Sequence, residues 1–272
     1  IFGALPFALG ATESSFTDAF FEAMSGLTTT GATVISGLDY LPDGLLLWRS
    51  ILQWLGGIGI IVVAMVFLPE LRVGGMQIFK SEGFDTFGKI LPRATEIAAQ
   101  VAWLYVGLTG ACAVIYIATG MRSFDAVLHA MTTIATGGFS TYDSSFVKFG
   151  ASTEYAAVVF MCLAALPFVR YVQLINGAPG SLFFDSQVRL FFIVLLVTVG
   201  FLTLVLWQGH QMTGELGFRK ALFNVVSITT GTGYASADYS SWGPVALVVF
   251  FYAGLVGGCA GSPSCSVKVF RY

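Results

Sequence analysis

The sequence predicts an all-α integral membrane protein built from pseudo-symmetric repeats. Of its 272 residues, 56% are hydrophobic and only 10% are charged, and the mean hydropathy is +0.81. Soluble domains carry roughly 25% charged residues, so this chain is expected to lie in lipid. Long apolar runs alternate with short segments that end in Thr and Gly, and this order recurs. Each repeat should contain a helix, a re-entrant half-length helix, a loop and a second helix.

Charge and cysteine content exclude several classes of protein. The net charge of −2 gives no reason to expect a nucleic-acid partner. The four cysteines show neither CxxC nor His-paired spacing, which argues against structural zinc and a disulfide framework. The chain begins without Met or a basic leader and ends directly after an apolar segment. We therefore expect an internal fragment of a longer protein.

Runs of roughly 20 apolar residues are long enough to cross the hydrocarbon core. Such runs lie near 45–68, 95–119, 153–176, 188–207 and 242–271, and residues 1–9 resemble the end of another.

Shorter segments at 16–28, 122–134 and 215–229 are too short to cross. Each opens with helix-start residues: Ser15 or Thr17 in the first, Ser123 in the second and Thr213 in the third. Half-length helices between spans indicate re-entrant pore helices.

The three short segments align without gaps. Residues 21–32, 128–139 and 223–234 share one frame, in which the glycines Gly31, Gly138 and Gly233 stand 107 and 95 residues apart. This internal repeat predicts three units. Residues 1–94 form an N-terminally incomplete first repeat with a cytoplasmic link, 95–187 the second repeat, and 188–272 the third.

The Thr/Gly loops after these helices are the candidate ion site. A half-helix whose C-terminus points to the bilayer centre presents unpaired carbonyls and the negative end of its dipole, which favour a cation. Glycine tolerates the positive φ that turns loop carbonyls inward. One such cluster could be a polar turn, but three in register indicate a carbonyl-lined filter around one pore. The candidate ligands are Thr29, Thr30, Gly31, Thr136, Gly137, Gly138, Gly231, Thr232 and Gly233.

The last apolar run is interrupted at membrane depth. Its glycines and Pro263 remove helix propensity and one backbone donor. A candidate intramembrane loop therefore comprises Gly257, Gly258, Cys259, Ala260, Gly261, Ser262 and Pro263. The alternative is a glycine-mediated contact between helices.

One position of the half-helices is polar in all three repeats. Glu22, His129 and Asn224 stand nine residues before the aligned glycines. They could hydrogen-bond behind the loops and hold them open, or they could lie exposed at the outer mouth.

Lys and Arg residues orient the chain. If the loops enter from outside, eight of these residues lie inside and five, Arg49 among them, lie outside. This bias agrees with the positive-inside rule.

In these motifs the chain resembles the Trk/Ktr/HKT superfamily of potassium transporters, most closely its TrkH-type uptake subunits. The likeness is carried by residues 25–33, 52–59, 135–140, 230–234 and 257–262. It implies four repeats around one pore, of which the fourth is absent here, and a gating role for the interrupted segment. Pro263, Cys265 and Ser266 depart from that family's usual Thr and glycines in this loop. The likeness further implies a homodimer on a cytosolic nucleotide-binding regulatory subunit, in the bacterial inner membrane.

The expected function is potassium transport across the cell membrane, with K⁺ as the transported ion and no cofactor in this chain. By resemblance, glycine at all three aligned positions (31, 138 and 233) is the potassium-preferring pattern. The alternative is a secondary transporter whose broken helices hold a cation or small substrate at mid-membrane. An enzyme is not expected, because the two histidines lie 81 residues apart and no catalytic constellation stands at depth.

Overall fold

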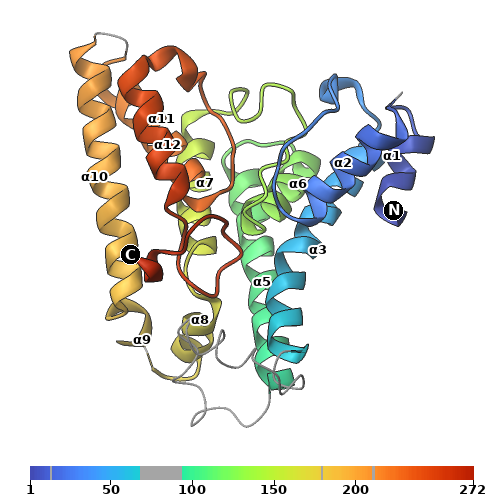
Figure 1. The fold of residues 1–272 in the computed structure, drawn as a ribbon, viewed down its shortest axis with the longest axis horizontal. Helices are drawn as coiled ribbons and strands as arrows, with labels where there is room; N and C mark the ends of the chain where they lie inside the picture. The colour runs from blue at the N-terminus through green and yellow to red at the C-terminus, as the bar shows by residue number, and fades with distance from the viewer. Residues whose placement is uncertain (13, 68–93, 179, 210–211) are drawn as a thin grey trace.

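The computed structural model describes every residue except 13, 68–93, 179 and 210–211 (Figure 1). The predicted cytoplasmic link after the first repeat lies mostly outside these described residues. The half-length helices lie in the upper half of this view, and the long helices of the first and second repeats run from there toward its lower end. No strand is present in the described part, apart from a bridge between Val256 and Val267.

The first repeat consists of η1 (Phe2–Ala4), α1 (Leu5–Leu9), the half-helix α2 (Phe16–Leu27), η2 (Leu38–Tyr40) and the long helix α3 (Asp43–Phe67). Ser15 caps α2, since its Oγ accepts a hydrogen bond from the Asp18 N–H at 3.2 Å. Its predicted start is therefore confirmed.

The second repeat has α5 (Ala94–Ala118), the half-helix α6 (Ser123–Ile134), α7 (Ala151–Ala164), α8 (Phe168–Ile175) and the short α9 (Gly180–Phe183). Arg122, rather than Ser123, is the cap residue of α6. The apolar run at 153–176 is not one continuous helix, because α7 and α8 meet at an angle of 87°. Pro167 explains the break: it lacks an N–H and disfavours helical backbone in the residue before it.

The third repeat has α10 (Ser186–Gln208), the half-helix α11 (Gly214–Thr230), η5 (Tyr239–Trp242), α12 (Pro244–Leu255) and η6 (Val269–Arg271). Thr213 precedes α11 as its cap residue but makes no side-chain cap bond. Helix α12 ends at Leu255, and residues 256–268 contain no helix, so the predicted interruption is confirmed.

Two helices of the described part are long and apolar enough to cross a membrane by themselves, Ala98–Ala118 and Ser186–Gln208. The bent pair α7 and α8 would be a third span if counted together. A multi-pass helical protein is thus the observed class. The exact division into repeats at 94/95 and 187/188 stays a prediction.

Glycines let α3 approach both half-helices of the first two repeats. A Cβ on Gly56 would overlap the Leu27 carbonyl at the end of α2. A Cβ on Gly57 would lie 2.9 Å from the Ala135 Cα at the end of α6. Helix α3 therefore packs directly beneath the places where two candidate loops begin.

Candidate functional site

The three Thr/Gly loops follow the same backbone path. Each has positive φ at the aligned glycine and again two residues earlier. The paired φ values are 54° and 78° for Thr29 and Gly31, 51° and 74° for Thr136 and Gly138, and 75° and 83° for Gly231 and Gly233. Left-handed backbone at a threonine costs roughly 1–2 kcal/mol, so its recurrence at Thr29 and Thr136 marks a conformation that the surroundings impose.

Hydrogen bonds from the loops to the half-helices also recur. The Thr30 N–H donates to the Ser25 carbonyl at 2.9 Å, and the Gly137 N–H donates to the Thr132 carbonyl at 2.9 Å. In the third repeat the donor is one residue later: the Gly233 N–H donates to the Ser227 carbonyl at 3.2 Å, as the Gly138 N–H does to Thr132 at 3.4 Å. Each loop is therefore folded back onto the C-terminal turn of its own half-helix.

The loops are neighbours around a common centre. A Cβ on Gly31 would overlap the Gly137 carbonyl of the second loop. One repeat further on, a Cβ on Gly138 would overlap the Thr232 carbonyl of the third loop. Because Gly137 and Thr232 are equivalent positions, the same contact joins the first loop to the second and the second to the third.

Most carbonyl oxygens of the loops are left without a protein donor. Those of seven predicted ligands accept no hydrogen bond from any described residue: Thr29, Thr30, Gly31, Thr136, Gly138, Thr232 and Gly233. The Thr136 hydroxyl is also buried without a partner. Thr29, Thr136 and Thr232 are buried, Gly31 and Gly138 are half-buried, and Thr30 and Gly233 are exposed. Carbonyl oxygens without a protein donor, gathered at one place, could replace the hydration shell of a cation.

The two remaining candidates have donors. The Gly137 carbonyl accepts a hydrogen bond from the Gln53 side chain at 2.7 Å. The Gly231 carbonyl lies 3.6 Å from the Cys265 Sγ.

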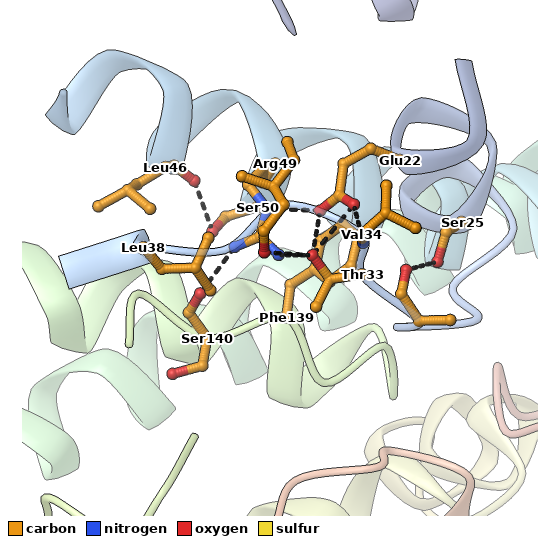
Figure 2. Close-up of polar contacts among 12 residues, drawn as sticks. Glu22, Ser25, Thr33, Val34, Leu38, Leu46, Arg49, Ser50, Phe139 and Ser140 are labelled. Carbon is orange, nitrogen blue, oxygen red and sulfur yellow. Dashed lines mark hydrogen bonds and ion pairs between the residues drawn. The ribbon is translucent and has the colours of Figure 1, made fainter. Parts of the chain in front are cut away.

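Glu22 lies at the centre of a buried cluster behind the first loop (Figure 2). Its carboxylate accepts hydrogen bonds from the Thr33 hydroxyl at 2.9 and 3.0 Å, the Val34 N–H at 3.0 Å and the Arg49 Nε at 2.8 Å. Both charged side chains are almost fully buried, at 0% and 2% exposure. Exposure at the outer mouth, the alternative for Glu22, is therefore excluded.

Arg49 joins the first repeat to the second. Its Nη1 donates to the Ser140 carbonyl at 2.8 Å, and its guanidinium lies 4.1 Å from the centre of the Phe139 ring. The sequence predicts Arg49 only as one of the five basic residues outside. Its position inside an apolar run was the one signal that it needs a buried partner.

His129 and Asn224 are buried at the equivalent positions and also contact the segments that follow their loops. The His129 Nε2 lies 3.1 Å from the Ser140 Oγ. The Asn224 Nδ2 donates to the Ser236 Oγ at 3.2 Å, and its Oδ1 accepts from the Ser236 N–H at 3.3 Å. The three side chains thus share one arrangement despite their different chemistry, and none of them is exposed.

Tyr234 is a further residue that sequence analysis missed. Its hydroxyl lies 2.5 Å from the Thr132 Oγ1 and donates to the His129 carbonyl at 3.1 Å. It therefore fastens the third loop to the half-helix of the second repeat.

The interrupted segment at 256–268 folds against the break between α7 and α8. The Cys259 N–H donates to the Ala165 carbonyl at 2.9 Å, and the Phe168 N–H donates to the Gly261 carbonyl at 3.1 Å. The loop therefore pairs with backbone groups released by the neighbouring break. Of the predicted loop residues, Gly257 also donates its N–H to the Val267 carbonyl at 2.9 Å.

The far side of this loop reaches the candidate filter. Cys265 is exposed and approaches Gly231 so closely that a Cβ on Gly231 would lie 2.5 Å from the Cys265 Sγ. The Lys268 ammonium donates to the Ser262 carbonyl at 3.1 Å and to the Ser264 carbonyl and hydroxyl. A cationic side chain therefore holds the loop in a compact turn beside the third Thr/Gly loop.

Loops of different repeats are joined by charged residues. Asp143 accepts hydrogen bonds from the Gly37 and Leu38 N–H groups at 2.9 and 3.1 Å, and Lys148 pairs with Asp39. The Lys148 hydrogen bond holds the pKa of Asp39 below its ordinary value. Between the second and third repeats, the buried Glu154 carboxylate binds Arg219 and Lys220 at 2.6 Å each.

Comparison with known proteins gives consistent relatives. Residues 3–272 match the family model for TrkH, described as a cation transport protein. The chain is 45% identical over 274 residues to the Trk system potassium uptake protein TrkI of Halomonas elongata, covering 100% of this chain and 55% of that protein. It is 40% identical over 275 residues to the Trk system potassium uptake protein TrkH of Escherichia coli K12, covering 99% and 57%.

A solved structure has the same fold. The crystal structure of the potassium transporter TrkH from Vibrio parahaemolyticus superposes with a TM-score of 0.87 at 38% identity, over 99% of this chain and 56% of that one. The chain therefore spans little more than half the length of the relatives that it matches.

Proposed function

Because the chain belongs to the TrkH family of cation transport proteins, we propose that the full-length protein conducts potassium ions across the bacterial inner membrane. The ion would move down its electrochemical gradient. Relatives named as potassium uptake proteins support this proposal.

The observation that carries the proposal is the group of free carbonyls on three equivalent loops. A potassium ion that enters a filter must exchange its hydration shell for oxygen atoms. The C-termini of α2, α6 and α11 lead directly into these loops, so the negative ends of their dipoles favour a cation at the same place. Gly31, Gly138 and Gly233 would then line one ion path.

A fourth Thr/Gly loop would close the ring that the three described loops begin around the ion path. The contacts from Gly31 to the second loop and from Gly138 to the third predict an equivalent neighbour for Gly233. A Cβ on Gly233 would meet no described atom within 4 Å. We infer that a fourth repeat of the full-length protein packs beside Gly233.

The loop at 256–268 would be the gate. Its contact with Gly231 through Cys265 puts it next to the third Thr/Gly loop, and the hydrogen bonds of Lys268 favour its compact turn. Opening would require these bonds to break or to move together with the loop.

A homodimer and a cytosolic nucleotide-binding regulatory subunit remain part of the proposal, on family resemblance. No catalytic step and no cofactor are needed for this function.

A secondary transporter is the second candidate. The break between α7 and α8 and the early end of α12 are features of helices that hold a substrate at mid-membrane. A coupled transporter would require a co-substrate gradient, whereas a pore would respond to the potassium gradient and the voltage alone.

Uptake of radioactive Rb⁺ into liposomes that contain the full-length protein tests both candidates. Trapped K⁺ should drive Rb⁺ accumulation without any proton or Na⁺ gradient, and external K⁺ should compete better than Na⁺. Accumulation only with a coupled gradient would favour the secondary transporter, and no accumulation would contradict both.

A further inference from the structure

The second loop differs from the other two in how it is braced. In the first loop, the Thr28 and Thr30 hydroxyls lie 2.7 Å apart. In the third loop, the equivalent Thr230 and Thr232 hydroxyls lie 2.9 Å apart. Both pairs tie a residue at the C-terminal end of the half-helix to the residue before the aligned glycine.

The second loop has no such hydroxyl pair, because Ala135 and Gly137 occupy the two positions. The Gln53 side chain of α3 stands there instead, and it is fully buried. A Cβ on Gly137 would overlap the Gln53 carboxamide. The missing side chain of Gly137 therefore provides the space that Gln53 fills.

The Gln53 carboxamide makes two hydrogen bonds across the aligned glycine. Its Nε2 donates to the Gly137 carbonyl at 2.7 Å, and its Oε1 accepts from the Phe139 N–H at 3.0 Å. These bonds fix the peptide groups on both sides of Gly138. In a planar trans peptide the C=O and N–H point in opposite directions. The Phe139 N–H points to α3, so the Gly138 carbonyl must point away from it.

The two hydrogen bonds of Gln53 also reduce the number of candidate ion ligands in the second loop. The Gly137 carbonyl is directed to Gln53, while the Gly138 carbonyl is directed away from α3 and accepts no hydrogen bond from a described residue. In the second loop Gly138 would therefore be the ion ligand, and Gly137 would be part of its support.

We propose that Gln53 is a positioning residue for ion selectivity, which replaces the threonine pair of the other loops and directs the Gly138 carbonyl into the ion path. This inference rests on the proposed potassium function. Gln53 does not touch the ion, and it acts through the backbone of the neighbouring repeat.

The first test is Gln53→Met in the full-length protein, because Met keeps the length of the side chain and removes both hydrogen bonds. The preference for Rb⁺ over Na⁺ in liposome uptake should fall by about five- to tenfold, the effect expected when about one hydrogen bond's worth of positioning energy is lost. Ser50→Ala is the matched control, since Ser50 is buried on the same helix and its hydroxyl, among the described residues, donates only to the Leu46 carbonyl of that helix at 3.1 Å. It should keep the wild-type preference.

The second test is a double-mutant cycle between Gln53→Ala and Gly137→Thr. Threonine alone at 137 should impair uptake, because it overlaps Gln53. With the shorter Ala at 53 the same threonine fits without overlap, so the two losses should not add. If Gln53→Met does not assemble, this cycle still tests whether Gln53 positions the second loop.

Unchanged selectivity in Gln53→Met, or simple addition in the cycle, would overturn the inference while wild-type Rb⁺ uptake stands. Wild-type protein without any preference for Rb⁺ would instead overturn the proposed function.

Discussion

At the scale of single residues, Gly138 is required to be glycine for two separate reasons. Gly138 has a φ of 74°, and a side chain on it would also overlap the Thr232 carbonyl of the next loop. Gly37 has nearly the same φ, 75°, but a Cβ there would meet nothing within 4 Å. Substitutions at these two glycines therefore distinguish the effect of backbone strain from the effect of crowding between loops.

Gly138→Ser should strongly reduce the preference for K⁺ over Na⁺, because the serine must push the second and third loops apart. Gly37→Ser should leave that preference unchanged and lower only the stability, by about 1 kcal/mol for the left-handed backbone. Rb⁺ uptake with Na⁺ competition measures both variants. Equal selectivity in the two would show that Gly138 does not line the path.

The ion pair between Glu22 and Arg49 is the second residue-scale feature. Loss of one partner from a buried pair leaves an uncompensated charge and costs about 3–5 kcal/mol. Glu22→Gln should therefore lower the thermal unfolding midpoint in detergent markedly. Loss of the Glu22 carboxylate should also lower the preference for K⁺ over Na⁺, because its partner Arg49 binds the Ser140 carbonyl behind the second loop.

Arg122→Gln is the control for this variant. Its pair with Asp43 is long, 3.5 Å, and both side chains are exposed, at 65% and 60%. Exposed pairs contribute about 0–1 kcal/mol, so the midpoint should hardly move. If Glu22→Gln behaves like Arg122→Gln, the buried cluster does not support the loops.

At the scale of elements, the loop at 256–268 should be accessible to a water-soluble thiol reagent at Cys265 and inaccessible to it at Cys259. Cys265 is exposed beside Gly231, whereas Cys259 is buried where the loop meets α7. A cationic thiosulfonate reagent should modify Cys265 and block Rb⁺ uptake. The Cys265→Ser variant should resist the block. Equal block in that variant would place the reactive thiol elsewhere.

Helix boundaries were the part of the fold that the sequence could predict. The half-helices expected at 16–28, 122–134 and 215–229 are Phe16–Leu27, Ser123–Ile134 and Gly214–Thr230 in the structure. Length, apolar content and turn residues are local properties, so they can be read from neighbouring positions in the chain. The break at Pro167 was also visible locally, but the apolar run on both sides concealed it.

Contacts between repeats could not be predicted in the same way. Arg49 and Gln53 bind partners 91 and 84 residues further along the chain. Their partners are backbone atoms, which carry no residue-specific signal. The polar column of Glu22, His129 and Asn224 could be found because the repeat itself aligned these positions, although their partners could not.

At the scale of the whole molecule, one contact repeated from loop to loop sets the arrangement of the site. Gly31 meets the carbonyl of Gly137, and Gly138 meets that of Thr232. Helix α3 supports two of these loops at once, because Gly56 and Gly57 let it approach both half-helices. The central claim is that these loops direct carbonyl oxygens at one dehydrated monovalent cation on a shared axis.

Anomalous diffraction from crystals of the full-length protein grown in Rb⁺ tests this claim most directly. We expect an Rb⁺ peak on the axis, within coordination distance of the Gly31, Gly138 and Gly233 carbonyl oxygens. An Rb⁺ peak away from these oxygens, or none on the axis while Rb⁺ uptake is intact, would contradict it.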